Sequence, residues 1–183
     1  MYWTGFYYII IYMKGCVIAM FKEITADKLD KNLISMIRDE WALISAGDQN
    51  NFNMMTASWG FFGEMWNKDC VICAIRPQRY TFEFMEATDT FALCFLGDNK
   101  APHKVCGSMS GRDVNKVEKT GLTPVFADGT VYFEQSETVI ICKKLYADFL
   151  HEDKFCNPSP LACYKGDYHK MYVGEIMKVL VKE

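Results

Sequence analysis

The sequence predicts a mainly β domain in which an antiparallel sheet or barrel carries flanking helices. About seven segments of the 183-residue chain have the composition of strands, and only two or three have that of helices. The strands dominate the C-terminal half, and no regular alternation of strands and helices is sustained, which argues against a parallel sheet. No internal repeat, low-complexity tract or linker separates two cores, so we expect one folded domain.

The strands are expected wherever an apolar run of strand length is bounded by turn residues. The best examples are the continuous apolar runs over residues 70–76 and 90–97, and the two longest segments lie near the C-terminus. In chain order, the predicted strands are residues 41–47, 54–60, 70–76, 90–97, 130–136, 138–153 and 169–183.

Helical patterns occur in three places. Residues 25–40 begin with Thr25, a capping-type residue, and their apolar side chains recur at helical spacing, which predicts an amphipathic helix. Residues 77–88 predict a helix with Pro77 at its first position, where the missing N–H does no harm. Residues 103–122 are expected to form a loop with short helical turns.

The N-terminal segment differs from the rest of the chain. Residues 1–19 are apolar and aromatic, and Lys14 divides them into two short pieces. A membrane span needs about 20 predominantly apolar residues, so an anchor is the less favoured interpretation and we expect no membrane partner. We expect the domain to cover residues 20–183, with 1–19 as an extension that reflects an over-extended translation start or forms an anchor.

Charge and cysteine content narrow the choice of partners and compartment. The formal net charge is −3 and no basic stripe interleaved with aromatic residues is present, so nucleic acid is not expected as a partner. Most of the eight cysteines lie inside apolar runs, which is typical of reduced core thiols and favours a cytoplasmic protein. Cys70 and Cys73 form a C-x-x-C pair, but residues three apart on a strand point to opposite faces, so we expect no metal there.

Several common kinds of site are excluded by missing motifs. The sequence has no G-x-G-x-x-G after a strand, no phosphate-binding P-loop and no G-x-S-x-G elbow. Only three histidines are present, and no two have the H-E-x-x-H spacing of a zinc hydrolase. These absences argue against a dinucleotide-binding domain, an NTPase and a zinc enzyme.

The segment RPQRYT, residues 76–81, is the strongest local signal. Arg79 and Thr81 would lie in the first turn of the helix predicted after Pro77, where a cation is unfavourable unless an anion is also present. Free N–H groups, a hydroxyl and the guanidinium groups of Arg76 and Arg79 would together hold a phosphate. The alternative is a solvated rim in which the arginines pair with nearby glutamates, Glu83 or Glu86.

The segment NMMTASWG, residues 53–60, combines apolar side chains with small hydroxyl residues. If it lines a cleft, Thr56 and Ser58 offer hydroxyls, the strand end offers free N–H groups, and Met and Trp side chains supply apolar walls. Such a set suits a flat aromatic ligand with a polar edge. The alternative is ordinary packing, with the hydroxyls bonded to a neighbouring loop.

The segment GSMSGRDVNK, residues 107–116, is a loop of small residues with two cations. Ser108, Ser110 and Gly111 allow close approach of the backbone, and Arg112 and Lys116 supply positive charge, so the loop is able to hold an anion. The alternative is a plain turn in which Asp113 caps a following helix.

Taken in order with YHKMYVGEI, residues 168–176, these segments resemble the flavin reductase-like, or flavoredoxin-like, family of FMN-binding split β-barrels. The resemblance runs from about Met20 to the C-terminus. It implies a homodimer with non-covalently bound FMN near the interface. The residues that it implies for FMN binding are Met55, Thr56, Ala57, Ser58 and Trp59 along the ring and ribityl chain, Arg76, Arg79, Tyr80 and Thr81 near the phosphate, Ser110, Gly111, Arg112 and Lys116 in the third loop, and His169 beside the site.

The resemblance also implies the chemistry. FMN would take electrons from NADH or NADPH and pass them to an acceptor, with no side chain required as a general base. The alternative is a flavoredoxin-type electron carrier that a redox partner protein reduces. A ligand-binding barrel without redox function, or a hydrolase that uses Ser58 or Ser110 with His169, is less favoured.

Overall fold

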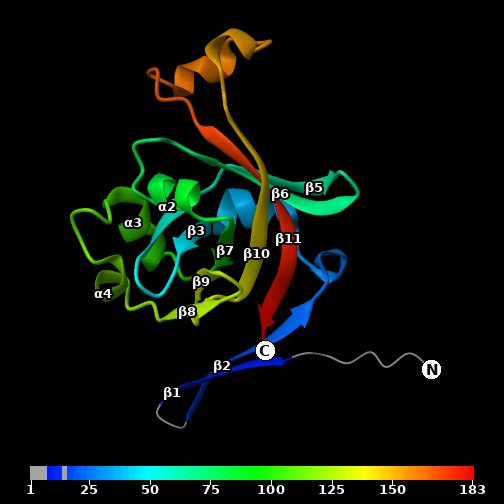
Figure 1. The fold of residues 1–183 in the computed structure, drawn as a ribbon, viewed down its shortest axis with the longest axis vertical. Coiled ribbons are helices and arrows are strands. Elements are labelled where there is room, and N and C mark those ends of the chain that lie inside the picture. Colours follow the sequence, from blue (N-terminus) through cyan, green and yellow to red (C-terminus); the bar gives the residue numbers. More distant parts are fainter. Residues whose placement is uncertain (1–7, 14–15) are drawn as a thin grey trace.

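One antiparallel sheet organises the part of the chain that the structure, a computed structural model, describes, which is residues 8–13 and 16–183 (Figure 1). Its strands are β1 (Tyr8–Met13), β2 (Cys16–Ile24), β3 (Ala42–Gly47), β4 (Phe52–Ala57), β5 (Gly60–Met65), β6 (Lys68–Ile75), β7 (Thr90–Phe95), β8 (Pro124–Ala127), β9 (Thr130–Phe133), β10 (Thr138–Phe149) and β11 (Lys170–Lys182). The order is β1-β2-β11-β10-β7-β3-β4, with the β5–β6 hairpin joined to β11 through β6, and β8–β9 forms a separate ribbon. Every strand pair among the described residues is antiparallel, which confirms the predicted mainly β class.

The helices are short and flank the sheet. They are α1 (Leu33–Ser35), α2 (Thr81–Ala87), α3 (Ala101–Ser108) and α4 (Lys116–Thr120), with 3-10 turns η1 (Ala26–Lys28), η3 (Glu152–Lys154) and η4 (Ser159–Cys163) and a π-helical turn η2 (Met36–Glu40). Helices α2 and α3 lie beside the β3–β4 edge of the sheet (Figure 1). This edge is where the candidate site forms.

The core occupies both faces of the sheet. Phe91 and Leu93 of β7 pack into one buried cluster. Ala92 and Cys94 pack into a second cluster on the other face, because side chains alternate along a strand. A strand that is buried on both faces is continuously apolar, and this explains why the sequence predicts β7 clearly.

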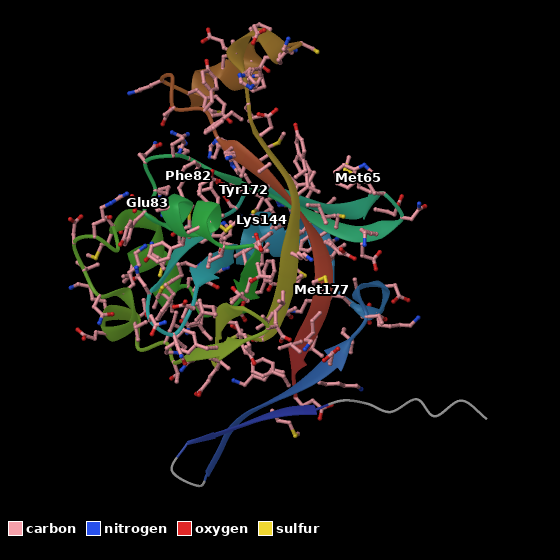
Figure 2. All side chains as sticks on the ribbon, viewed as in Figure 1. Met65, Phe82, Glu83, Lys144, Tyr172 and Met177 are labelled. Carbon is pink, nitrogen blue, oxygen red and sulfur yellow. The ribbon has the colours of Figure 1, made fainter. Side chains whose placement is uncertain are left out.

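The long β10–β11 pair carries the chain beyond the sheet. The segment between these strands projects at the top of Figure 1. Near the base of this projection, Phe82 of α2 and Tyr172 of β11 lie beside each other (Figure 2), with ring centroids 6.4 Å apart. The start of β11 is therefore held against α2, and the residue before it, His169, lies close to the end of β6.

Two predicted helices are corrected by the structure. The helix expected over 25–40 begins only at Leu33, because the Asn32 side chain accepts hydrogen bonds from the N–H groups of the second and third residues after it, both at 3.1 Å. The helix expected from Pro77 begins at Thr81. Residues 77–80 instead form turns, closed by a hydrogen bond from Arg79 N to Arg76 O at 3.0 Å.

Four strands, β1, β2, β5 and β8, were not predicted. The segment 54–60, expected as one strand, breaks after Ala57, and the chain resumes as β5 at Gly60. Residues Ser58 and Trp59 therefore form a connection between two strands, and this connection lies at the candidate site.

The expected domain start at residue 20 falls within β2. Residues Phe21–Ile24 pair with β11, and the Phe21 side chain is fully buried. Most of the extension predicted for residues 1–19 belongs to the β1–β2 hairpin, while residues 1–7 and 14–15 lie outside the described part. In that part, no helix is long and apolar enough to span a bilayer.

Candidate functional site

A groove of about 200 Å³ lies where the end of β4, the end of β6 and the start of β11 meet; we call it the Thr56 groove. Its lining residues are Met55, Thr56, Ala57, Ser58, Trp59, Ala74, Arg76, Arg79 and His169. All of them except Ala74 were predicted as site residues. The two strongest sequence signals, NMMTASWG and RPQRYT, therefore contribute to one groove.

Strand β4 offers its backbone to this groove because it is an edge strand. Within the described residues it pairs only with β3. The hairpin closes with a hydrogen bond from Asp48 N to Asn51 O at 3.0 Å, and alternation from that point directs the N–H and C=O groups of Met54 and Thr56 away from β3. The Met54 carbonyl does accept from an outside donor, Lys116 Nζ, at 2.7 Å. The outward backbone groups of Thr56 are thus available to a ligand.

The Thr56 hydroxyl is held from the opposite side by α3. It donates to the carbonyl oxygen of His103 at 2.8 Å and lies 3.4 Å from His103 Nδ1. Gly107 of α3 faces Thr56, and a Cβ atom at that position would lie 3.6 Å from Thr56 Cβ, an ordinary contact distance. One hydroxyl of the predicted pair is therefore committed to a neighbouring helix, while Thr56 still lines the groove.

The two arginines of the groove have different partners. Arg76 pairs with Asp167 at 2.5 Å and donates to Cys163 O at 3.0 Å. Three hydrogen bonds, from the Lys165 N–H first and then from Gln78 and Arg76, together hold the pKa of Asp167 well below its usual range. The charge of Arg76 is thus compensated within the chain.

Arg79 is half-buried, and no described carboxylate pairs with it. Its guanidinium donates to the carbonyl of Cys106 at 2.8 Å. Burial lowers its pKa, and nearby Arg76 lowers it further. Neither arginine pairs with the glutamates of the rim alternative, because Glu83 pairs with Arg112 and Glu86 with Lys170. A cation without an acidic partner on the wall of a groove is a natural contact for an anionic group.

Aromatic rings form the outer wall of the groove. The rings of Trp59 and His169 lie 4.8 Å apart between centroids, and His169 Nδ1 is 3.1 Å from the Tyr164 hydroxyl. Burial lowers the pKa of His169 to about 4, with a further contribution from Arg76, so its imidazole is neutral at pH 7. Among the described residues, no serine hydroxyl forms a hydrogen bond with His169, whose Nδ1 is paired with the Tyr164 hydroxyl.

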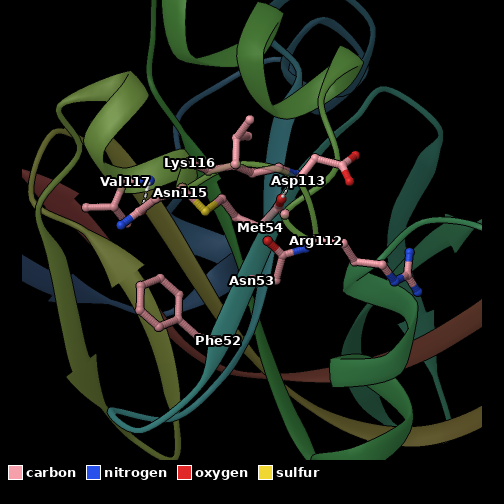
Figure 3. Close-up of a pocket in the computed structure, with 10 residues that line it drawn as sticks. Phe52, Asn53, Met54, Arg112, Asp113, Asn115, Lys116 and Val117 are labelled. Atoms are coloured by element: carbon pink, nitrogen blue, oxygen red, sulfur yellow. Dashed lines mark hydrogen bonds between the residues drawn. The ribbon is translucent and has the colours of Figure 1, made fainter.

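The third predicted loop lines a different groove. Gly111, Arg112 and Lys116 face Phe52, Asn53 and Met54 across a space of about 420 Å³, the Lys116 groove (Figure 3). Ser110 closes the turn, since its carbonyl accepts from Asp113 N at 3.1 Å. Helix α4 is capped by the side chain of Asn115, not by Asp113 as the alternative supposed.

Thr81 and Tyr80 lie outside both grooves. The Thr81 hydroxyl is fully buried and accepts from Asn53 Nδ2 at 3.0 Å. Tyr80 stacks under the guanidinium of Arg112, which lies 4.5 Å from the ring centroid. A direct contact of either side chain with a phosphate is therefore not provided by this arrangement.

Some residues that shape the site gave no signal in the sequence. His103 and Cys106 sit on α3 within a segment expected to be mostly loop, and their roles follow from contacts with Thr56 and Arg79. Ala74, the remaining residue of this kind, lines the groove near the end of β6. No group of three or more His, Cys, Asp or Glu residues in the described part could hold a metal ion.

Comparison with known proteins identifies the family. A model of the flavin reductase like domain matches residues 37–183. The fold is similar to flavoredoxin of Desulfovibrio vulgaris (Miyazaki F), at 20% identity and a TM-score of 0.62, covering 78% of this chain and 69% of that chain. It is also similar to a split barrel domain from Shewanella frigidimarina NCIMB 400, at 21% identity and a TM-score of 0.61, covering 78% of this chain and 66% of that chain.

A third similar structure is the NADH:FAD oxidoreductase of Streptomyces globisporus C-1027, at 13% identity and a TM-score of 0.59, covering 79% of this chain and 78% of that chain. No curated protein matches the sequence. These structures support the fold, an antiparallel split barrel whose sheet runs from β1 to β4 without closing. Since the family model covers most of the chain, the protein belongs to the flavin reductase-like family.

Proposed function

We propose that the Thr56 groove binds FMN and that the protein is an oxidoreductase that passes electrons through this flavin. The main support for this proposal is that the unpaired edge of β4 and the guanidinium of Arg79, which has no acidic partner among the described residues, line the same groove. Backbone groups at Thr56 would serve the polar edge of the flavin ring, Trp59 would supply an apolar surface, and Arg79 would contact the phosphate. Family membership supports the same ligand.

When bound, FMN supplies the redox chemistry by accepting a hydride from a nicotinamide. The chain's own residues bind and orient the flavin. The neutral His169, packed against Trp59, closes one side of the groove without adding charge. The proposal requires no side chain of the groove to act as a general base.

We propose that the protein works as a homodimer with FMN near the interface. A space of about 200 Å³ is smaller than the roughly 300–1,000 Å³ of typical ligand pockets, so one chain supplies only part of the site. Trp59 at the groove is 46% exposed, and Phe61 and Trp66 on the adjacent hairpin are 66% and 55% exposed. Met65 lies at the tip of the same hairpin (Figure 2). Several exposed large apolar side chains on one hairpin are typical of an interface.

NADH or NADPH is the proposed electron donor. The visible spectrum of purified protein with added FMN, recorded anaerobically before and after NADH or NADPH, tests both steps. We expect a bound-flavin spectrum, bleaching by nicotinamide, and many turnovers when an acceptor is present. Protein that takes up no FMN would overturn the proposal.

The second candidate is a flavoredoxin-type electron carrier with the same flavin site. It is favoured by the similarity in fold to the Desulfovibrio flavoredoxin. The two functions differ in one result: a carrier would bind FMN but would be reduced by a partner protein and not by NADH or NADPH. Reduction by dithionite without multiple turnover by either nicotinamide would select the carrier.

A further inference from the structure

His103 is a buried imidazole that the proposed function does not use. It lies on α3, is 1% exposed, and faces Thr56 of the groove on one side and the ring of Trp41 on the other. Its Nε2 atom is buried and has no hydrogen-bond partner among the described residues. A buried polar atom without a partner is unusual and indicates which nitrogen carries the proton.

The neutral imidazole of His103 carries one N–H proton, on either Nδ1 or Nε2. Burial lowers the pKa of His103 to about 4, so the imidazole is neutral at pH 7. A proton on Nε2 would leave a buried N–H donor without an acceptor, which costs about 1–3 kcal/mol. A proton on Nδ1 faces Thr56 Oγ1 at 3.4 Å, so the Nδ1–H form avoids that cost.

The hydrogen of the Thr56 hydroxyl also has a partner within the chain. The hydroxyl donates to the His103 carbonyl at 2.8 Å. With its own hydrogen engaged there and the Nδ1–H directed at one lone pair, Thr56 Oγ1 has only a lone pair left for the groove. Its polarity toward a ligand is thus fixed by a single residue of α3.

We propose that His103 is a positioning residue: its carbonyl takes the hydrogen of the Thr56 hydroxyl, and its Nδ1–H holds the hydroxyl oxygen in one orientation, so that the hydroxyl acts as an acceptor toward the ligand. The site then selects a donor at this position, such as a ribityl hydroxyl or the imide N–H of a flavin. The inference rests on the proposed function and deepens it. His103 acts through Thr56 and does not itself line the groove.

Trp41 keeps the imidazole in place. The two rings meet edge to face with centroids 5.9 Å apart. Trp41 Nε1 donates to Arg38 O at 3.0 Å, and Lys100 Nζ lies 5.1 Å from the Trp41 ring centroid. Trp41 adopts a φ of 66°, a region that bulky residues rarely occupy and that costs about 1–3 kcal/mol. The surrounding contacts offset this strain and hold the ring against His103.

The test is a double-mutant cycle read by FMN dissociation constants, from flavin fluorescence quenching, and by thermal unfolding. His103→Phe keeps a ring but removes both nitrogens, and His103→Asn keeps an amide donor near the position of Nδ1. Thr56→Val removes the hydroxyl, and Lys104→Ala on the exposed face of α3 is the control. We expect His103→Phe and Thr56→Val each to weaken FMN binding by about 2–12-fold, the value of one hydrogen bond.

The proposal is tested by whether the losses of FMN affinity at His103 and Thr56 are additive. We expect the double variant His103→Phe/Thr56→Val to bind no more weakly than Thr56→Val alone, and His103→Asn to bind within about 2-fold of wild type. His103→Phe should change the unfolding temperature little, because it removes an unpartnered buried nitrogen together with the Nδ1–H bond to Thr56. Additive losses, or His103→Asn as weak as His103→Phe, would overturn the role of His103.

A ligand-free measurement separates this inference from the proposed function. Long-range ¹⁵N–¹H correlation spectra of the imidazole report which nitrogen is protonated, and we expect the Nδ1–H form. Finding the Nε2–H form in a protein that binds FMN would overturn the role of His103 alone. Wild-type protein that binds no FMN would overturn the proposed function together with the role of His103 in ligand selection.

Discussion

Replacing Arg79 by Met should weaken FMN far more than riboflavin. Arg79 is the groove cation without an acidic partner in the described structure, and the only hydrogen bond of its guanidinium there goes to the Cys106 carbonyl. A hydrogen bond between a charged donor and a phosphate contributes about 1.5–3 kcal/mol, which converts to roughly 10–150-fold in the dissociation constant. Riboflavin has no phosphate, so its affinity should change by less than about 3-fold, the effect of lost packing alone.

The assay is titration of each flavin into protein, followed by fluorescence quenching at low and high salt. Arg112→Met is the matched control, because Arg112 pairs with Glu83, stacks on Tyr80 and lines the Lys116 groove instead. We expect that control to leave the FMN affinity within about 2-fold, since an exposed ion pair contributes little. Equal losses for FMN and riboflavin, or a larger loss for Arg112→Met, would refute the placement of the phosphate beside Arg79.

Three further outcomes follow from the packing and charges. Gly111→Ala should destabilise the protein by about 1–3 kcal/mol, because the new methyl group would clash with the buried Asn53 amide, whereas Gly63→Ala, with no atom within 4 Å, should be nearly neutral in urea unfolding. Between pH 6.5 and 4 the unfolded chain binds more protons than the folded one at His103 and at His169, so the unfolding free energy should fall by up to about 3 kcal/mol for each as the pH drops. Urea unfolding at pH 7 and pH 4.5 measures this, and His103→Phe should remove its own share of the difference. Phe61→Lys should lower the dimer fraction in sedimentation velocity and weaken FMN binding with it, and an unchanged dimer would contradict the proposed interface.

The long strands were predictable because their apolar runs are longer than any turn signal that interrupts them. Strands β10 and β11 are 12 and 13 residues long and match the predicted segments 138–153 and 169–183 except at their ends. Strand β7 is buried on both faces, and after Thr90 its sequence is continuously apolar. For such segments, local composition and the final fold agree.

The β5–β6 hairpin was hidden by its turn. Trp66 and Asn67 both have a φ of 58°, the backbone of a tight hairpin turn that usually carries Asn-Gly or Asp-Gly. The Asn67 N–H donates to Glu64 Oε1 at 2.6 Å, which helps to hold this turn. Because an exposed Trp occupies the position where Asn or Asp is expected, the sequence gives no turn signal between β5 and β6.

The sequence indicated which segments contribute to the site, but not which neighbours each side chain contacts. Residues 55–59 of NMMTASWG and the two arginines share a groove. The helix expected from Pro77 would have placed Thr81 beside Arg79 at a phosphate, but the turns at 77–80 shift the helix start and leave the Thr81 hydroxyl buried against Asn53. Sequence spacing indicates which residues are candidates for a site, but it does not show in which direction a turn points their side chains.

The loop that carries Lys116 lies outside the Thr56 groove, yet it bears on the same guanidinium. Lys116 is 5% exposed, and its ammonium donates to Met54 O at 2.7 Å and to Cys106 O at 3.5 Å. Arg79 donates to that same Cys106 carbonyl at 2.8 Å. The Cys106 carbonyl near the end of α3 therefore meets two cations that come from different grooves.

This shared acceptor gives the third loop an indirect role. A buried ammonium that bonds only to carbonyl groups is costly to dehydrate, and burial lowers its pKa accordingly. Its bonds fix the end of α3 to β4, and this fixed carbonyl in turn orients Arg79 toward the Thr56 groove. The third loop thus bears on the Thr56 groove through the carbonyl that it holds in place.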